Sequence, residues 1–98
     1  WISGQIPLDP ISMALVKGDI AAQAEQVFTN LAAIAEAAGG TLNNAVKVNI
    51  SLTDLSDFDA VNTVMASRFE APYPARACVQ VAALPKGADI EVEAILVL

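Results

Sequence analysis

Two strongly apolar segments near the end of the chain carry charged side chains, and this combination constrains the fold more than any other feature. Residues 74–81 are typical of a strand and contain Arg76. Residues 90–94 are typical of a second strand and contain Glu91 and Glu93, which share one face because side chains alternate along a strand. If the two strands pair through the Pro/Gly connection between them, the arginine and the acids face each other across a groove. Such a groove would bind a small anion and supply an acid or a base.

The chain carries little charge for its size. Of its 98 residues, 55% are hydrophobic and only 16% are charged. A single domain of this length has a large surface relative to its volume, and a monomer normally covers that surface with more charge. A compact, alanine-rich core is one interpretation of this composition. We favour the other, a homo-oligomer that buries an apolar face of its sheet.

The charged and reactive residues argue against several classes of function. The net charge is −6 and the five basic residues are scattered, so nucleic-acid binding through phosphate neutralisation is disfavoured. With no histidine and one cysteine, the chain lacks the usual ligand sets for transition metals. It also cannot build a Ser-His or Cys-His nucleophile pair. We therefore expect no metal, and chemistry carried out by carboxylates, arginine and the backbone.

The sequence shows no membrane or secretory segment. No apolar run approaches the roughly 20 residues of a membrane span, and no basic segment with a cleavage site is seen. The single cysteine cannot form an intramolecular disulfide, which favours a reducing compartment. We expect a cytoplasmic protein without a membrane partner.

Hydrophobic periodicity predicts a single domain with two helices. An amphipathic helix of about five turns begins after an N-cap at Asp19 and ends before Gly39. A second helix covers about residues 57–70, behind a capping box formed by Ser56 and Asp59. The remaining predicted elements are strands at residues 1–7, 45–53, 74–81 and 90–98.

This order of elements predicts an α+β fold, a mixed sheet with both helices packed on one face. Strands joined through a helix tend to pair in parallel with a right-handed crossover, while the final two strands can pair antiparallel. Two helices cannot cover both faces of the sheet. The uncovered face should carry Arg76, Cys78 and Gln80 with the odd-numbered positions of the last strand, or the opposite set, and subunits should meet there.

Arg76 is the strongest single candidate for a functional residue. Its planar guanidinium can hold a carboxylate by two parallel charge-assisted hydrogen bonds. The alternative is a structural salt bridge to Glu91 or Glu93. The two glutamates lie two residues apart on one face, and such a pair suits a group that must both take and give a proton. Their alternative is a solvated or salt-bridged strand edge.

Four further positions are candidates with weaker signals. Cys78 has no histidine to activate it, so a small buried residue whose main chain faces the site is favoured over a thiolate nucleophile. Asn62 in the second helix and Ser3 in the first strand could be ordinary solvated positions or ligand contacts. Gly4 could let a ligand or another backbone come close.

Several segments together resemble the RidA/YjgF family in order and spacing. They are Ser-Gly-Gln-Ile-Pro at 3–7, Ala-Ala-Gln-Ala at 21–24, Asp-Leu-Ser-Asp-Phe at 54–58 with Val-Asn at 61–62, Pro-Ala-Arg-Ala-Cys-Val at 74–79, Leu-Pro-Lys-Gly at 84–87 and Ile-Glu-Val-Glu-Ala-Ile at 90–95. The resemblance spans residues 1–98 as one domain. It begins after the first strand region of typical members, which holds a tyrosine near the site, and residues 69–76 look shorter than in many relatives.

The resemblance implies a chorismate-mutase-like α+β fold assembled as a homotrimer, with sites in the clefts between subunits. It implies hydrolysis of reactive enamine and imine intermediates, such as 2-aminoacrylate and 2-iminobutyrate, to 2-oxo acids and ammonia. An enzyme of this kind is a 2-iminobutanoate/2-iminopropanoate deaminase and needs no cofactor. Its partners are a small imine or 2-oxo acid and further copies of itself.

The resemblance also implies roles for individual residues. Arg76 matches the arginine that grips the substrate carboxylate, and Glu91 matches the glutamate that positions and activates the attacking water. Cys78 matches a position whose backbone contacts the ligand. Further pocket positions, contributed from a neighbouring subunit or the cleft wall, are Ser3, Gly4 and Asn62.

Two other functions compete with the deaminase. A non-catalytic module that binds 2-oxo acids or related carboxylates would share Arg76 but would not need Glu91. Ribonuclease and translation-inhibitor activities are also attached to the family, but the acidic charge and the lack of histidine argue against them.

Overall fold

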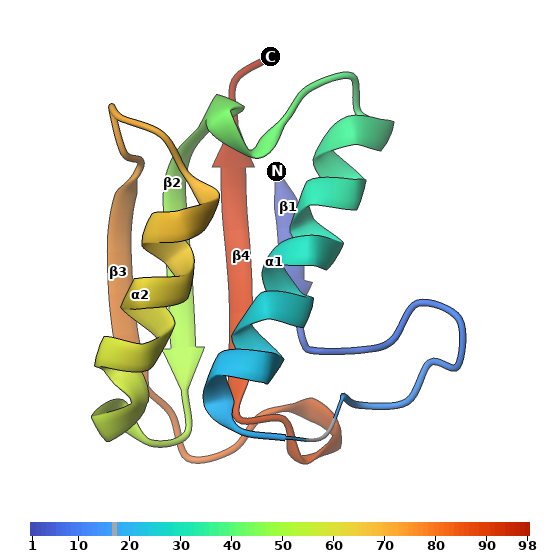
Figure 1. Ribbon diagram of the computed structural model, residues 1–98, viewed down its shortest axis with the longest axis vertical. Coiled ribbons are helices and arrows are strands. Elements are labelled where there is room, and N and C mark those ends of the chain that lie inside the picture. The colour runs from blue at the N-terminus through green and yellow to red at the C-terminus, as the bar shows by residue number, and fades with distance from the viewer. Residues whose placement is uncertain (17) are drawn as a thin grey trace.

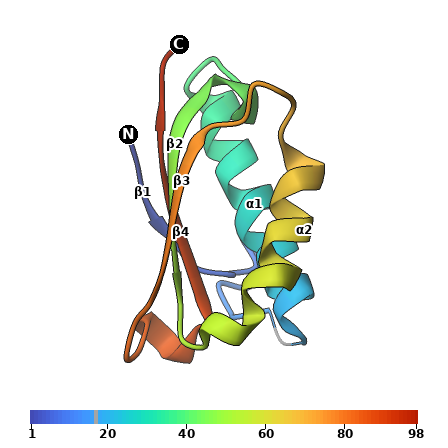
Figure 2. The same cartoon turned by 90° about the vertical axis from the view of Figure 1, so that its left-hand side faces the viewer.

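The computed structural model describes residues 1–16 and 18–98, and in them two helices pack against one face of a four-stranded sheet (Figures 1 and 2). The elements are β1 (Ile2–Gln5), α1 (Ile20–Ala37), β2 (Ala45–Leu52), α2 (Phe58–Arg68), β3 (Ala75–Gln80) and β4 (Ile90–Leu96). Single turns of 3-10 helix lie at Leu42–Asn44, Leu55–Asp57 and Pro85–Gly87. The predicted α+β fold and the order of its elements are confirmed.

Helix α1 begins and ends where the sequence predicts. The Asp19 side chain accepts a hydrogen bond of 2.9 Å from the backbone N–H of Ala22. At the other end Gly39 adopts a φ of 92°, and the N–H of Gly40 donates to the carbonyl of Ala35 at 2.9 Å. This left-handed termination suits glycine, which has no β-carbon to clash. The buried face of the helix includes Ala24, Val27, Phe28, Leu31 and Ala35.

The predicted capping box of α2 is wrong. Asp54 caps this region instead, because its carboxylate accepts hydrogen bonds from both the backbone N–H and the hydroxyl of Ser56. These bonds hold the pKa of Asp54 below its ordinary value. Ser56 lies inside the 3-10 turn Leu55–Asp57 and not at the N-cap position, which is Asp57 and has no side-chain cap hydrogen bond. Helix α2 then covers Phe58–Arg68, which is shorter than the predicted 57–70.

The two charged strands are not neighbours, so the predicted pairing between them is wrong. The sheet order is β1-β4-β2-β3, with β4 antiparallel to both β1 and β2, and with β3 parallel to β2 at the sheet edge. Burial explains this order. Ile90, Val92 and Ala94 of β4 are at most 2% exposed, which requires a neighbouring strand on each side of β4. Arg76 and most of β3 are exposed, which suits a strand at the edge of the sheet.

The register sends the arginine and the acids to opposite faces of the sheet. Arg76 pairs with Val48, and Val48 is fully buried beneath the helices. Glu91 and Glu93 pair with Ser51 and Asn49 on the open face. Paired residues of adjacent strands point to the same side, so neither predicted composition of the uncovered face is correct. That face combines the glutamates with small side chains of β3.

The open face is the side of the sheet away from both helices (Figure 2). On it Asn49 donates a hydrogen bond of 2.9 Å to the Glu93 carboxylate, and Val79 is 53% exposed. Its side chains are mostly small or polar, with Lys47 as its one basic position among the strand residues that the structure describes. Among the described residues, both helices lie on the other side of the sheet and leave this surface uncovered. Among residues 1–16 and 18–98, no helix is long and apolar enough to cross a membrane.

We expect the substitution Asp19→Ala to lower the free energy of unfolding by about 1 kcal/mol, because it removes the side-chain acceptor at the start of α1. The measurement is urea denaturation followed by circular dichroism. Asp19→Asn keeps an acceptor and should stay close to the parent. An equal loss in both variants would show that the charge, and not the cap, matters.

Candidate functional site

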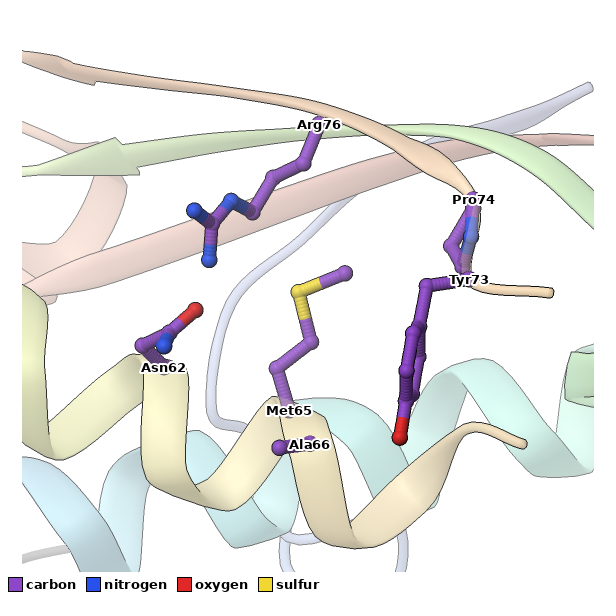
Figure 3. Close-up of a pocket in the computed structure, with 6 residues that line it drawn as sticks. All are labelled: Asn62, Met65, Ala66, Tyr73, Pro74 and Arg76. Carbon is purple, nitrogen blue, oxygen red and sulfur yellow. The ribbon is translucent and has the colours of Figure 1, made fainter. Parts of the chain in front are cut away.

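Arg76 lies on the edge strand β3 and extends toward helix α2 (Figure 3). Its guanidinium carbon is 4.9 Å from the centroid of the Phe58 ring. Within residues 1–16 and 18–98, no Asp or Glu oxygen lies within 4.0 Å of an Arg76 nitrogen. The structural salt bridge to Glu91 or Glu93 is therefore absent from the chain. The guanidinium keeps its charge and its hydrogen-bond donors available for a ligand.

Two pockets adjoin Arg76 and its neighbours. A pocket of about 480 Å³ is lined by Asn62, Met65, Ala66, Tyr73, Pro74 and Arg76 (Figure 3). A second pocket, of about 440 Å³, is lined by Leu55, Ser56, Phe58, Asp59 and Cys78. Three of the predicted site residues, Asn62, Arg76 and Cys78, thus lie in adjacent hollows between α2 and the edge of the sheet.

Local structure explains how these three residues come together. Arg76 and Cys78 are two residues apart on one strand, so they share its helix-facing side. Asn62 is on α2, one turn after Phe58, and its amide points toward the guanidinium (Figure 3). We call Asn62, Arg76 and Cys78 the arginine group. Together they offer a charged clamp and an amide beside a partly apolar wall, which suits a small carboxylate.

Burial raises the pKa of the Cys78 thiol, and the nearby Arg76 charge offsets only part of this effect. A raised thiol pKa means that Cys78 is protonated at neutral pH. A thiolate is the nucleophilic form, so the geometry argues against the nucleophile interpretation. Cys78 is half-buried, as expected for a residue that contributes packing and backbone.

The other three predicted site residues lie together on the opposite face. Ser3 and Gly4 are on β1, whose register with β4 is irregular at this point. A β-carbon added to Gly4 would lie 2.7 Å from the Glu91 carboxyl carbon, so the glycine makes room for this acid. We call Ser3, Gly4 and Glu91 the acid group. The close approach expected at Gly4 is made by a side chain of the same protein.

A single chain therefore divides the predicted site into two halves separated by the sheet. None of the three residues of the arginine group is a carboxylate, although Asp59 lines the adjoining pocket, and none of the three residues of the acid group is a cation. Among the described residues, no cluster of three or more acidic, cysteine or histidine side chains could hold a metal ion. The six residues can act on one molecule only if different copies of the chain supply the two halves.

Sequence reasoning missed Phe58, Met65 and Tyr73 at this site. Phe58 and Met65 follow the apolar periodicity of α2, which indicates core residues, and both do contact the core. Tyr73 is 62% exposed beside the pocket and comes three residues before Arg76 in the chain. An exposed aromatic residue that close to the arginine was the available signal.

Known proteins match this chain in sequence over nearly its whole length. A family model described as Endoribonuclease L-PSP matches residues 1–98. The RutC family protein y4sK of Sinorhizobium fredii is 49% identical over 98 residues, covering 100% of this chain and 78% of that protein. The 2-iminobutanoate/2-iminopropanoate deaminase of Capra hircus is 48% identical over 97 residues, which are 99% of this chain and 71% of that protein.

A crystal structure of RidA from the Antarctic bacterium Psychrobacter sp. PAMC 21119 superposes with a TM-score of 0.94 at 59% identity. The match covers 98% of this chain and 77% of that one. Sequence and fold therefore agree over essentially the whole chain. The chain belongs to the Endoribonuclease L-PSP family, which is the RidA/YjgF family that its own segments resemble.

Proposed function

We propose that this protein hydrolyses small reactive imines and enamines of the 2-iminobutyrate and 2-aminoacrylate type to 2-oxo acids and ammonia. The proposal rests above all on Arg76, whose guanidinium lines a pocket with no carboxylate partner in the described chain. An unneutralised arginine in that position suits a substrate that brings its own carboxylate. The name of the deaminase from Capra hircus supports the same activity.

In this mechanism Arg76 holds the substrate carboxylate and places the adjacent C=N carbon for attack. Glu91 accepts a proton from a water molecule as the water oxygen bonds to that carbon. That proton is returned to nitrogen, which gives a carbinolamine. Glu91 then takes the proton of the new hydroxyl and passes it to the same nitrogen, the C–N bond breaks, and ammonia leaves as the carbonyl of the 2-oxo acid forms. An enamine such as 2-aminoacrylate enters this sequence as its imine tautomer. An imine is already electrophilic, so orientation and proton transfer supply most of what the reaction requires, and no cofactor is needed.

The working unit of this mechanism is a homotrimer with sites between its subunits. Arg76 and Glu91 lie on opposite faces of one sheet, so the arginine group of one copy must meet the acid group of another. Such a head-to-tail contact repeats until a ring closes, and the family resemblance supplies the number three. The same contact buries the open face. We place the protein in the cytoplasm, with no nucleic-acid or membrane partner.

A second candidate is a module that binds small carboxylates without turning them over. The separation of Arg76 from Glu91 favours it, because an assembly that failed to unite them would still bind through the arginine. A ribonuclease is disfavoured despite the description of the family. A net charge of −6 repels RNA, and the chain has no histidine for acid-base cleavage.

Arg76→Ala should lower kcat/KM roughly 30- to 1,000-fold, because it removes a charged partner of the substrate carboxylate. Arg76→Lys keeps the charge but loses the planar fork, so its loss should be smaller. The assay follows release of 2-oxo acid and ammonia from a dehydratase that generates 2-aminoacrylate. Size-exclusion chromatography checks that the oligomer persists. Full activity in Arg76→Ala would remove the arginine from the mechanism.

Glu91→Gln should lower kcat about 100- to 10,000-fold while leaving the affinity for 2-oxobutyrate nearly unchanged, because the base is lost and the anion clamp is retained. Gly4→Ala should also lower kcat, since its β-carbon displaces the Glu91 carboxylate. A parent protein that binds 2-oxobutyrate in calorimetry, yet accelerates no imine hydrolysis, would favour the binding module.

A further inference from the structure

We propose that Phe58 is a positioning residue that holds the Arg76 guanidinium in its anion-binding orientation. This inference rests on the proposed function, because it explains how the clamp of that site is set. The guanidinium carbon lies 4.9 Å from the centre of the Phe58 ring, within the range of a cation–π contact. In the part of the chain that the structure describes, the side chain of Arg76 makes no hydrogen bond or ion pair, and its backbone pairs with β2.

Arg76 needs such support because it is an exposed side chain on an edge strand. A long, flexible side chain loses rotamer freedom when it grips a ligand, and that loss weakens binding. A contact made before the ligand arrives reduces the loss. The ring of Phe58 is the contact that the geometry supplies.

An aromatic ring supports a guanidinium without competing with the substrate. The ring attracts the cation through its face, whereas the five N–H donors of arginine lie in the guanidinium plane and remain free. A carboxylate in the same place would use two of those donors and neutralise the charge. Because its neighbour is an aromatic ring and not a carboxylate, the Arg76 guanidinium is oriented and still has its charge and N–H donors available for the substrate.

The position of Phe58 is itself fixed by the hydrophobic core and by the turn that precedes α2. It is the first residue of α2 and is half-buried against the hydrophobic core. The preceding 3-10 turn is fixed by the hydrogen bonds that Ser56 donates to Asp54. Phe58 also lines the pocket that contains Cys78, while Arg76 lines the other pocket. Phe58 and Arg76 thus connect the hydrophobic core to both pockets, because Phe58 packs on the core and lines one pocket while Arg76 lines the other.

The test compares three variants in the full chain. Phe58→Leu removes the ring but keeps an apolar side chain, and Phe58→Tyr keeps the ring. Phe69→Leu is the matched control, because it also removes an aromatic ring but does so just after the end of α2. Phe69 packs edge-on against Phe28, with ring centroids 6.0 Å apart, and in the described residues Arg76 makes its cation–π contact with Phe58 and not with Phe69. The probes are 2-oxobutyrate binding by calorimetry and the NMR signals of the Arg76 side chain, which an overlying ring shifts upfield.

We expect Phe58→Leu to weaken 2-oxobutyrate binding roughly two- to fivefold and to abolish the upfield shift. Phe58→Tyr should retain both, and Phe69→Leu should lose stability without losing affinity. Equal affinity in Phe58→Leu and the parent would overturn the positioning role, as would Arg76 signals without an upfield shift in the parent. If the upfield shift is present but the parent binds no 2-oxobutyrate, the proposed function fails, and with it the role of Phe58 in ligand binding. The cation–π contact between Arg76 and Phe58 would then be a structural contact alone.

Discussion

The central position of β4 is the constraint on which the rest of the structure depends. By pairing with β1 on one side and β2 on the other, β4 buries its apolar side chains under α1 and displaces β3 to the edge. The same pairing turns Glu91 toward the open face, while the parallel register of β2 and β3 turns Arg76 toward α2. The division of the site into two halves is thus a direct consequence of how the core is filled.

Local patterns predicted the elements well but not their order in the sheet. The N-cap at Asp19 and the glycine termination of α1 depend on neighbouring residues, so they can be predicted from neighbouring residues. Pairing between distant strands has no such local signal, and the short connection between β3 and β4 favoured a hairpin that does not form. The capping box at Ser56 failed because Asp54 caps a 3-10 turn that includes Ser56, so the serine does not stand at the N-cap of α2.

The candidate site shows the same limits. Residue types and family resemblance made Arg76 and Glu91 candidates, and the register then placed the two on opposite faces of the sheet within one chain. Phe58 could not be recognised from periodicity, because a ring that packs on the core and also supports a cation has the pattern of a core residue. Gly4 was expected to let a ligand or a backbone come close, and within one chain the Glu91 side chain makes the close approach.

We propose that each site combines Arg76 of one subunit with Glu91 of another. The most direct measurement unfolds the inactive variants Arg76→Ala and Glu91→Gln together, refolds them as mixed oligomers, and assays imine hydrolysis. In a directional ring, about one site in four would regain both residues, so we predict roughly a quarter of the parent activity. Differently tagged chains verify that mixed oligomers form. A mixture that contains them but is as inactive as either variant alone would contradict the claim.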